Sequence, residues 1–149
     1  MNSRTILLVE DNHQDEILTL RALKKINLAN RINVVRDGRQ AIDYLFRQGD
    51  FSGREGPDLP TVILLDIHLP RMSGLEVLER LRADSRTRLC PIVLLTSSDE
   101  ERDRLQGYQS GANSFVRKPL DFSDFAETVS RLGVYWMAVN EPPQQGADG

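Results

Sequence analysis

Five short apolar runs alternate with stretches of helical length, and this alternation constrains the fold more than any other feature of the sequence. The runs are Thr5–Val9, Ile32–Val35, Thr61–Asp66, Pro91–Thr96 and, more weakly, Ser114–Lys118. Runs of this length and character are typical of strands that are buried on both faces. Strands that alternate with helices predict an α/β fold, a doubly wound five-stranded parallel sheet with right-handed crossovers and five helices on both faces.

Helical spacing and helix-end signals support the same order. One stripe of residues repeats every third or fourth position, as one face of a helix does: Phe122, Phe125, Val129, Leu132 and Trp136. Ser73 to Glu76 and Ser98 to Glu101 both fit a capping box, which predicts a helix start at each. Tyr135 and Trp136 are adjacent on this last helix and cannot both face inward, so we expect one of them at the surface or an interface.

Length and composition predict one packed domain. The chain has 149 residues, of which 40% are hydrophobic and 28% charged, so a sizeable core is available. We expect a domain over residues 1–139 and a flexible tail over 140–149, which is rich in proline, glycine and glutamine. A formal net charge of −3 argues against a protein whose whole surface binds nucleic acid and leaves a local basic patch open. The single cysteine allows no internal disulfide. No apolar run reaches the ~20 residues of a membrane span, and no signal peptide is recognisable. We therefore expect a cytoplasmic protein.

Acidic residues stand at the ends of two predicted strands. Glu10 and Asp11 follow the first strand and Asp66 ends the third. Ligands bind beyond the carboxyl ends of strands in an open parallel sheet, so the three carboxylates are expected to converge there. Such a cluster repels itself by up to ~4 kcal/mol per pair at about 4 Å and an effective dielectric of about 20, and a cation relieves this. Oxygen ligands suit Mg²⁺.

Thr96 ends the fourth strand and Lys118 the fifth, where they add a hydroxyl and a fixed positive charge to the acidic edge. Carboxylate, metal, hydroxyl and ammonium together suit an aspartate that accepts a phosphoryl group, because the cations neutralise charge on the transferring oxygens. The sequence therefore predicts an aspartate at this edge that accepts a phosphoryl group.

Four segments carry a family resemblance. "LLVEDN", "VILLDIHLPRMSGLEVLERLR", "IVLLTS" and "ANSFVRKP" resemble the receiver domains of two-component response regulators, over roughly residues 4 to 139. The resemblance implies a flavodoxin-like strand order of 2-1-3-4-5 and a phosphoacceptor at Asp66. It also implies that Asp11, Asp66 and the backbone carbonyl of His68 bind Mg²⁺ directly, and that Glu10 acts through water.

The resemblance assigns the remaining positions as well. Thr96 matches the switch hydroxyl that hydrogen-bonds the phosphoryl group. Phe115 matches the switch aromatic residue, and the alternative is that it only packs in the core. Lys118 matches the lysine that pairs with a phosphoryl oxygen, and its bond to Pro119 is expected to be cis. The His68 ring is expected to be exposed and not a metal ligand.

Two further segments resemble the small stand-alone receivers that serve bacterial phytochrome histidine kinases. They are the long loop Gly49–Pro60 and the ending Tyr135–Pro143. That similarity implies a sensor histidine kinase, of the bacteriophytochrome kind, as partner. It also implies a homodimer through the fourth helix, fifth strand and fifth helix, with no binding to nucleic acid or membrane. Such a protein is not an enzyme beyond its own phosphotransfer and dephosphorylation.

Four other functions compete with this interpretation. A Mg²⁺-dependent phosphatase with an aspartyl-phosphate usually has a second acid two residues after the nucleophile, where this chain has His68. A receiver-shaped interaction module that never takes phosphate would not need the full set of acceptor, acids, hydroxyl and lysine. A flavin or nucleotide carrier is disfavoured because neither G-x-x-x-x-G-K-[ST] nor G-x-G-x-x-G occurs. A DNA-binding regulator would need a recognition domain beyond the fifth helix.

Overall fold

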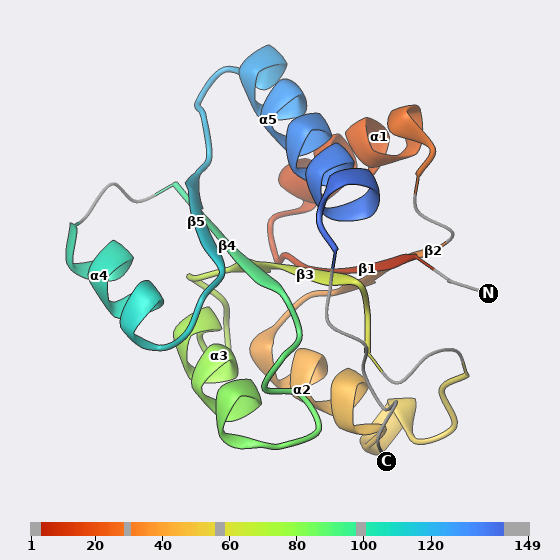
Figure 1. Ribbon diagram of the computed structural model, residues 1–149, viewed down its shortest axis with the longest axis vertical. Coiled ribbons are helices and arrows are strands. Elements are labelled where there is room, and N and C mark those ends of the chain that lie inside the picture. Colours follow the sequence, from red (N-terminus) through yellow and green to blue (C-terminus); the bar gives the residue numbers. More distant parts are fainter. Residues whose placement is uncertain (1–3, 29–30, 56–58, 98–100, 142–149) are drawn as a thin grey trace.

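The computed structural model describes residues 4–28, 31–55, 59–97 and 101–141, which form one sheet with helices on both faces (Figure 1). Each strand lies within one residue of its predicted run: β1 (Thr5–Val9), β2 (Arg31–Val35), β3 (Val62–Asp66), β4 (Ile92–Thr96) and β5 (Ser114–Arg117). The three central strands are buried along their whole length, as their continuous apolar runs require.

All neighbouring strands are parallel, and their order is β2-β1-β3-β4-β5. This confirms the predicted doubly wound sheet and its strand order. The chain moves from β1 to one edge and then crosses back to β3, so the direction of winding reverses between β1 and β3. The carboxyl ends of these two strands therefore flank the place where such a sheet binds its ligands.

Five α-helices cover the sheet. Helices α1 (His13–Ile26) and α5 (Phe122–Val134) pack side by side on one face (Figure 1). The other face carries α2 (Gly38–Phe46) and α3 (Gly74–Ala83), with α4 (Glu101–Gln109) beside β5. A short 3-10 helix (Gly49–Phe51) lies in the predicted long loop, and a π-helical turn (Tyr135–Val139) follows α5. None of the helices in these described ranges is both long and apolar enough to cross a membrane.

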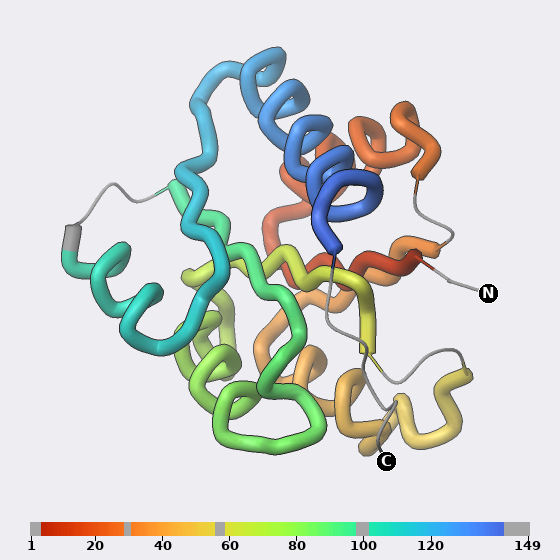
Figure 2. The backbone as a smooth tube through the Cα atoms, in the orientation of Figure 1, coloured from red at the N-terminus to blue at the C-terminus, as the bar shows by residue number. Residues whose placement is uncertain are grey.

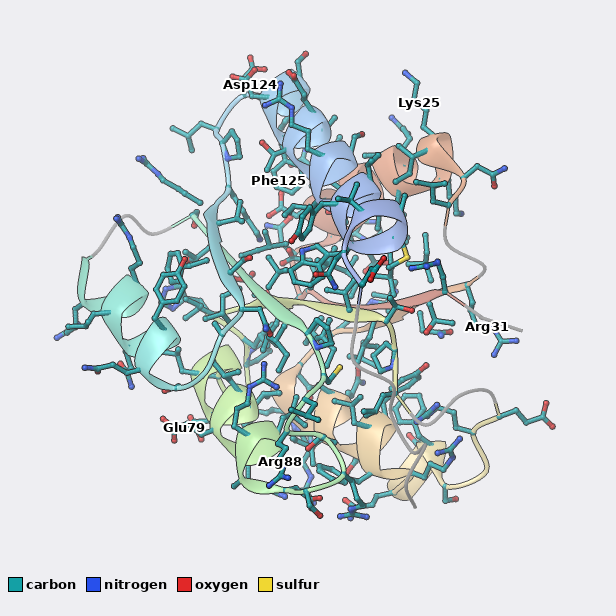
Figure 3. All side chains as sticks on the ribbon, in the orientation of Figure 1. Lys25, Arg31, Glu79, Arg88, Asp124 and Phe125 are labelled. Atoms are coloured by element: carbon teal, nitrogen blue, oxygen red, sulfur yellow. The ribbon has the colours of Figure 1, made fainter. Side chains whose placement is uncertain are left out.

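Each face of the sheet has its own apolar core. Phe125 of α5 points toward the sheet and joins the core beneath α1 and α5, whereas Lys25 of α1 points away from it (Figure 3). Ile42 of α2 and Leu78 of α3 belong to the opposite core. Of the adjacent aromatic pair, Trp136 is buried and Tyr135 is 47% exposed, which confirms that only one of the two faces inward.

Side-chain caps fix where the helices begin. The Ser73 hydroxyl accepts a hydrogen bond from the N–H of Glu76 at 3.2 Å, which confirms the predicted helix start at Ser73, and the Glu76 carboxylate accepts from the Ser73 hydroxyl at 3.3 Å. The second predicted box begins at Ser98, and residues 98–100 lie outside the described ranges. Residues 142–149 of the predicted tail also lie outside them.

The predicted cis bond before Pro119 is wrong. The described chain contains no cis peptide bond, so the bond between Lys118 and Pro119 is trans. The trans isomer of such a bond is the intrinsically favoured one, by about 0.5 to 1 kcal/mol. With the trans bond in place, the Lys118 side chain still reaches the carboxylates of β1 and β3, so its position does not require the cis form.

Gly74 allows the start of α3 to pack closely against the backbone at the end of β3, and this can be tested. A Cβ atom at Gly74 would lie 2.1 Å from the backbone oxygen of Asp66 and 2.9 Å from Cα of Ile67, and neither backbone atom can move freely. We therefore expect Gly74→Ala to lower the free energy of unfolding by about 1 to 3 kcal/mol, measured by urea denaturation. Gly53→Ala is the matched control, because a Cβ there meets nothing within 4 Å. Equal midpoints for the two variants would contradict the close packing at Gly74.

Candidate functional site

The sequence-predicted residues meet at the carboxyl edge of the sheet. Strand β1 runs from the right of the view toward the left, and its parallel neighbours end on the same side (Figure 2). Glu10 and Asp11 follow β1, and Asp66 is the last residue of β3. Their carboxylates each offer one oxygen, and these oxygens all lie within 4.8 Å of one another. The predicted convergence of the three acids is confirmed.

Lys118 binds this acidic cluster through a buried ammonium group. Its Nζ lies 2.7 Å from Oε1 of Glu10, 3.2 Å from Oδ2 of Asp66 and 3.0 Å from Oδ2 of Asp15. The Lys118 backbone N–H donates to the carbonyl of Thr96 at 2.7 Å, which holds the lysine at the end of β4. Burial alone would lower the pKa of Lys118, but the charges of Asp66 and Glu10 outweigh it and raise that pKa.

Glu10 is the most buried of the three acids, with only 1% of its surface exposed. Burial and the neighbouring charge of Asp66 raise the pKa of Glu10 to about 8, and the nearby Lys118 offsets only part of this. The second oxygen of Glu10 accepts a hydrogen bond from the N–H of Asn12 at 3.2 Å. Glu10 is therefore on the buried side of the acidic cluster, whereas Asp11 is on its solvent-exposed side.

Sequence reasoning missed Asp15 as a member of the site. Asp15 lies in the first turn of α1, where its N–H donates to the side chain of the N-cap Asn12 at 2.9 Å. This cap places its carboxylate over the strand ends and beside Lys118. The spacing from Asn12 to Asp15 is that of an N-cap and the third helical residue, and this pattern would have located Asp15 in the first turn.

Asp66 uses its two carboxylate oxygens differently. Oδ2 accepts from Lys118, whereas Oδ1 lies 3.4 Å from the N–H of His68, a long hydrogen bond. Oδ1 is therefore the less constrained oxygen. The His68 ring is largely exposed, as expected, yet its Nε2 lies 3.5 Å from Oδ2 of Asp103 on α4, a contact that sequence reasoning did not foresee.

The two predicted switch residues are near the same edge. Thr96 is fully buried at the end of β4, in register with Arg117 of β5. Phe115 of β5 is half-buried and packs against the core beneath α2 and α3. The switch roles of Thr96 and Phe115 and the role of the His68 carbonyl as a metal ligand stay predictions.

The donor set fits a divalent cation. Glu10, Asp11 and Asp66 provide only carboxylate oxygens, which are hard ligands, and their separations let one ion contact them together. Lys118 compensates for part of their negative charge, and the exposed Asp11 leaves the front of the cluster accessible to water. The arrangement can hold a cation and present Oδ1 of Asp66, the less constrained oxygen, to a ligand.

This fold and this acidic edge define a response regulator receiver domain. The model of that family, described as "Response regulator receiver domain", matches residues 6–130. The chain therefore belongs to the response regulator receiver domain family.

Two curated relatives match most of this chain. It is 40% identical over 138 residues to the probable methanogenesis regulatory protein FilR2 of Methanothrix harundinacea, covering 93% of this chain and 86% of the relative. It is 31% identical over 134 residues to response regulator Rcp1 of Synechocystis sp., covering 90% of this chain and 89% of Rcp1.

Solved structures of response regulators have the same fold as this chain. The Mn²⁺-bound form of Rcp1 has a TM-score of 0.88 at 30% identity, with 95% of this chain and 99% of that chain covered. The phosphorylated cyanobacterial phytochrome response regulator RcpA has a TM-score of 0.89 at 30% identity, covering 96% and 100%. The bacteriophytochrome response regulator RtBRR is 47% identical, with a TM-score of 0.75 and coverage of 99% and 88%. The predicted similarity to receivers of the phytochrome kind is thereby confirmed.

The raised pKa of Glu10 predicts how the metal-free protein responds to pH. A carboxyl whose pKa is near 4.5 in the unfolded chain and about 8 in the folded one binds its proton more tightly when folded. The stability gained from this proton is complete below the unfolded pKa and is lost as the pH rises through about 8. We expect the free energy of unfolding in EDTA to fall from about pH 5 to about pH 8 and to level off above that, measured by urea denaturation.

Glu10→Gln should abolish most of that fall, because the amide does not titrate. Glu127→Gln is the matched control, since Glu127 is exposed on α5 and pairs with Arg131. A decline that is the same in wild type and in Glu10→Gln would show that another group causes it.

Proposed function

We propose that this chain accepts a phosphoryl group on Asp66 from the phosphohistidine of a sensor histidine kinase and later loses it by hydrolysis. In the transfer, Oδ1 of Asp66 forms a bond to phosphorus, the bond from phosphorus to the histidine nitrogen breaks, and that nitrogen keeps the electron pair. The observation that carries the proposal is the pairing of Oδ2 of Asp66 with the buried ammonium of Lys118, which leaves Oδ1 available.

Lys118 has the position to stabilise the transferred group. Its ammonium already bridges Asp66 and Glu10, so it lies next to the oxygens that a phosphoryl group on Asp66 would bring. A preorganised cation of this kind lowers the barrier because it needs no rearrangement when charge develops. Asp15 and Glu10 hold the ammonium in place, and the Thr96 hydroxyl is the predicted partner of a phosphoryl oxygen.

Mg²⁺ is our proposed cation. Asp11 and Asp66 would hold it directly and Glu10 through water, and when bound it would neutralise charge on the phosphoryl oxygens. The structure supports a divalent ion through the spacing of the three carboxylates, and the relative Rcp1 has a Mn²⁺-bound form.

The downstream effect is a change of surface. A phosphoryl group adds a charge of about −1.5 to −2 beside Thr96, which would bias the position of Thr96 and of Phe115. Relatives named for phytochrome signalling support a bacteriophytochrome histidine kinase as the donor, and we place the chain in the cytoplasm with that kinase, without nucleic acid or membrane as partners. Catalysis would be limited to its own phosphotransfer and dephosphorylation.

The labelling of Asp66 tests this proposal directly. Acetyl phosphate with Mg²⁺ should add one phosphoryl group to the wild type, seen by intact mass, and peptide mapping should place it on residues around Asp66. Asp66→Asn should abolish it, because an amide is not a nucleophile. A phosphatase would instead turn over the reagent without a persistent adduct, and an interaction module would take no label.

Metal binding predicts a pattern of melting temperatures. Asp66→Asn and Asp11→Asn should each melt higher than wild type in EDTA, because one repelling charge is gone. Mg²⁺ at ten times its dissociation constant should stabilise the wild type by roughly 1.4 kcal/mol, or about 3 to 6 °C for a domain of this size. Both variants should respond less to Mg²⁺, and Glu10→Gln should keep more of the response. A wild type that ignores Mg²⁺, with both variants melting lower in EDTA, would exclude a shared site.

A homodimer through α4, β5 and α5 is part of the proposal. Exposed apolar side chains support it on α4 and along the end of α5: Leu105, Tyr108, Val134, Tyr135 and Val139. Because Trp136 is buried, Tyr135 is the aromatic residue of the pair that would contribute. Light scattering at micromolar concentration should give about twice the chain mass of 16.9 kDa.

Tyr135→Ser and Leu105→Ser should weaken this dimer. Leu28→Ser is the control, since Leu28 is also exposed but precedes β2, the strand at the opposite edge of the sheet from β5. A strictly monomeric wild type, with and without a phosphoryl mimic, would exclude the dimer.

A further inference from the structure

The inner face of α4 has few anchors. Among the side chains of α4 that the structure describes, Arg102 to Gln109, only Asp103 and Gly107 are buried. They are four residues apart and so lie on the same face, one turn from each other. The large apolar residues Leu105 and Tyr108 are 56% and 52% exposed. The helix is therefore held by a carboxylate and by close backbone packing rather than by buried apolar side chains.

The first anchor is a pairing with the acceptor loop. Asp103 is only 9% exposed, and a carboxylate removed from water to this degree needs a compensating partner. Its Oδ2 lies 3.5 Å from Nε2 of His68, whose ring is more than half exposed. His68 belongs to the loop between β3 and α3, so this contact joins that loop to α4.

The second anchor is the approach of Gly107 to the sheet. A Cβ at Gly107 would lie 2.7 Å from Cδ1 of Leu94 and 3.1 Å from the ring of Phe115. Helix α4 thus lies directly on the predicted switch aromatic. A displacement of α4 at Asp103 would therefore change the packing of Gly107, one turn away, against Phe115.

His68 also faces the acceptor. Its backbone N–H lies 3.4 Å from Oδ1 of Asp66, the oxygen that Lys118 leaves free. A phosphoryl group bonded to Oδ1 would occupy the space next to this N–H. One residue therefore contacts the reacting carboxylate through its main chain and α4 through its side chain.

We infer that His68 is a positioning residue that couples the chemical state of Asp66 to α4 through Asp103. The inference rests on the proposed phosphorylation of Asp66, and it adds a route to α4 that does not pass through Thr96. In the resting state the His68 ring holds Asp103 and keeps α4 against Phe115. Phosphorylation moves the loop at His68, the ring leaves Asp103, and α4 loses this contact with the acceptor loop.

Hydrogen exchange of α4, read by mass spectrometry in Mg²⁺ buffer, tests this route. His68→Ala and Asp103→Ala should each speed the exchange of α4 amides in the resting protein by roughly 2- to 10-fold. The double variant should exchange no faster than either single one, because both remove the same contact. Asp103 lies in the first turn of α4, where an acid also interacts favourably with the helix dipole, so His68→Ala, which lies outside α4, is the variant that isolates the contact. Gln106→Ala, on the exposed face of α4, should leave exchange unchanged.

Beryllium fluoride serves as the phosphoryl mimic in the second arm. It should speed exchange of α4 in the wild type and in Gln106→Ala, and it should have little further effect in either alanine variant of the pair. Unchanged exchange in His68→Ala and Asp103→Ala, additive effects in the double variant, or an undiminished response to beryllium fluoride would each overturn the inference. Intact mass after acetyl phosphate separates the two proposals, since a wild type that takes no label refutes the phosphorylation of Asp66 itself.

Discussion

The buried ammonium of Lys118 is the interaction on which the site depends. It joins the ends of β1, β3 and β5 and the first turn of α1, because its partners Glu10, Asp66 and Asp15 come from three of these elements. Without it, two nearly buried carboxylates would repel each other in a medium that screens poorly. The same cation that makes the acidic cluster compatible with folding leaves one oxygen of Asp66 available for chemistry.

The helices around this cluster differ in how much apolar surface they bury, and the proposed switch depends on that difference. Helices α1, α2, α3 and α5 bury apolar stripes in two cores, whereas α4 presents an acid and a glycine to the sheet. A helix that buries so little apolar surface has a low free energy of local unfolding. Elements that move in allosteric transitions typically have such low local stability. Under the proposed phosphorylation of Asp66, the added charge would act on this weakly anchored helix and leave the sheet intact.

The positions of the strands and of the principal acids could be predicted because both follow from local pattern. Continuous apolar runs define buried strands, and Glu10, Asp11 and Asp66 are at strand ends, which a parallel sheet brings to one edge. Other features depend on tertiary contacts that no local pattern encodes. Asp103 was not predictable as a partner of His68, because the path of α4 decides that contact. The bond before Pro119 was expected to be cis from family resemblance alone, and its trans form shows that the placement of Lys118 does not depend on it.

The most direct test of the central role of Lys118 is a comparison of Lys118→Met in two backgrounds, by urea denaturation in EDTA near pH 9, where Glu10 of the wild type is ionised. In the wild type, removing the ammonium should cost about 3 to 5 kcal/mol, because buried carboxylates lose their counter-charge. In a Glu10→Gln, Asp66→Asn background, the same substitution should cost less than about 1 kcal/mol, because no buried charge is left to compensate. An equal cost in both backgrounds would contradict the role of Lys118 as the cation that holds the acidic cluster together.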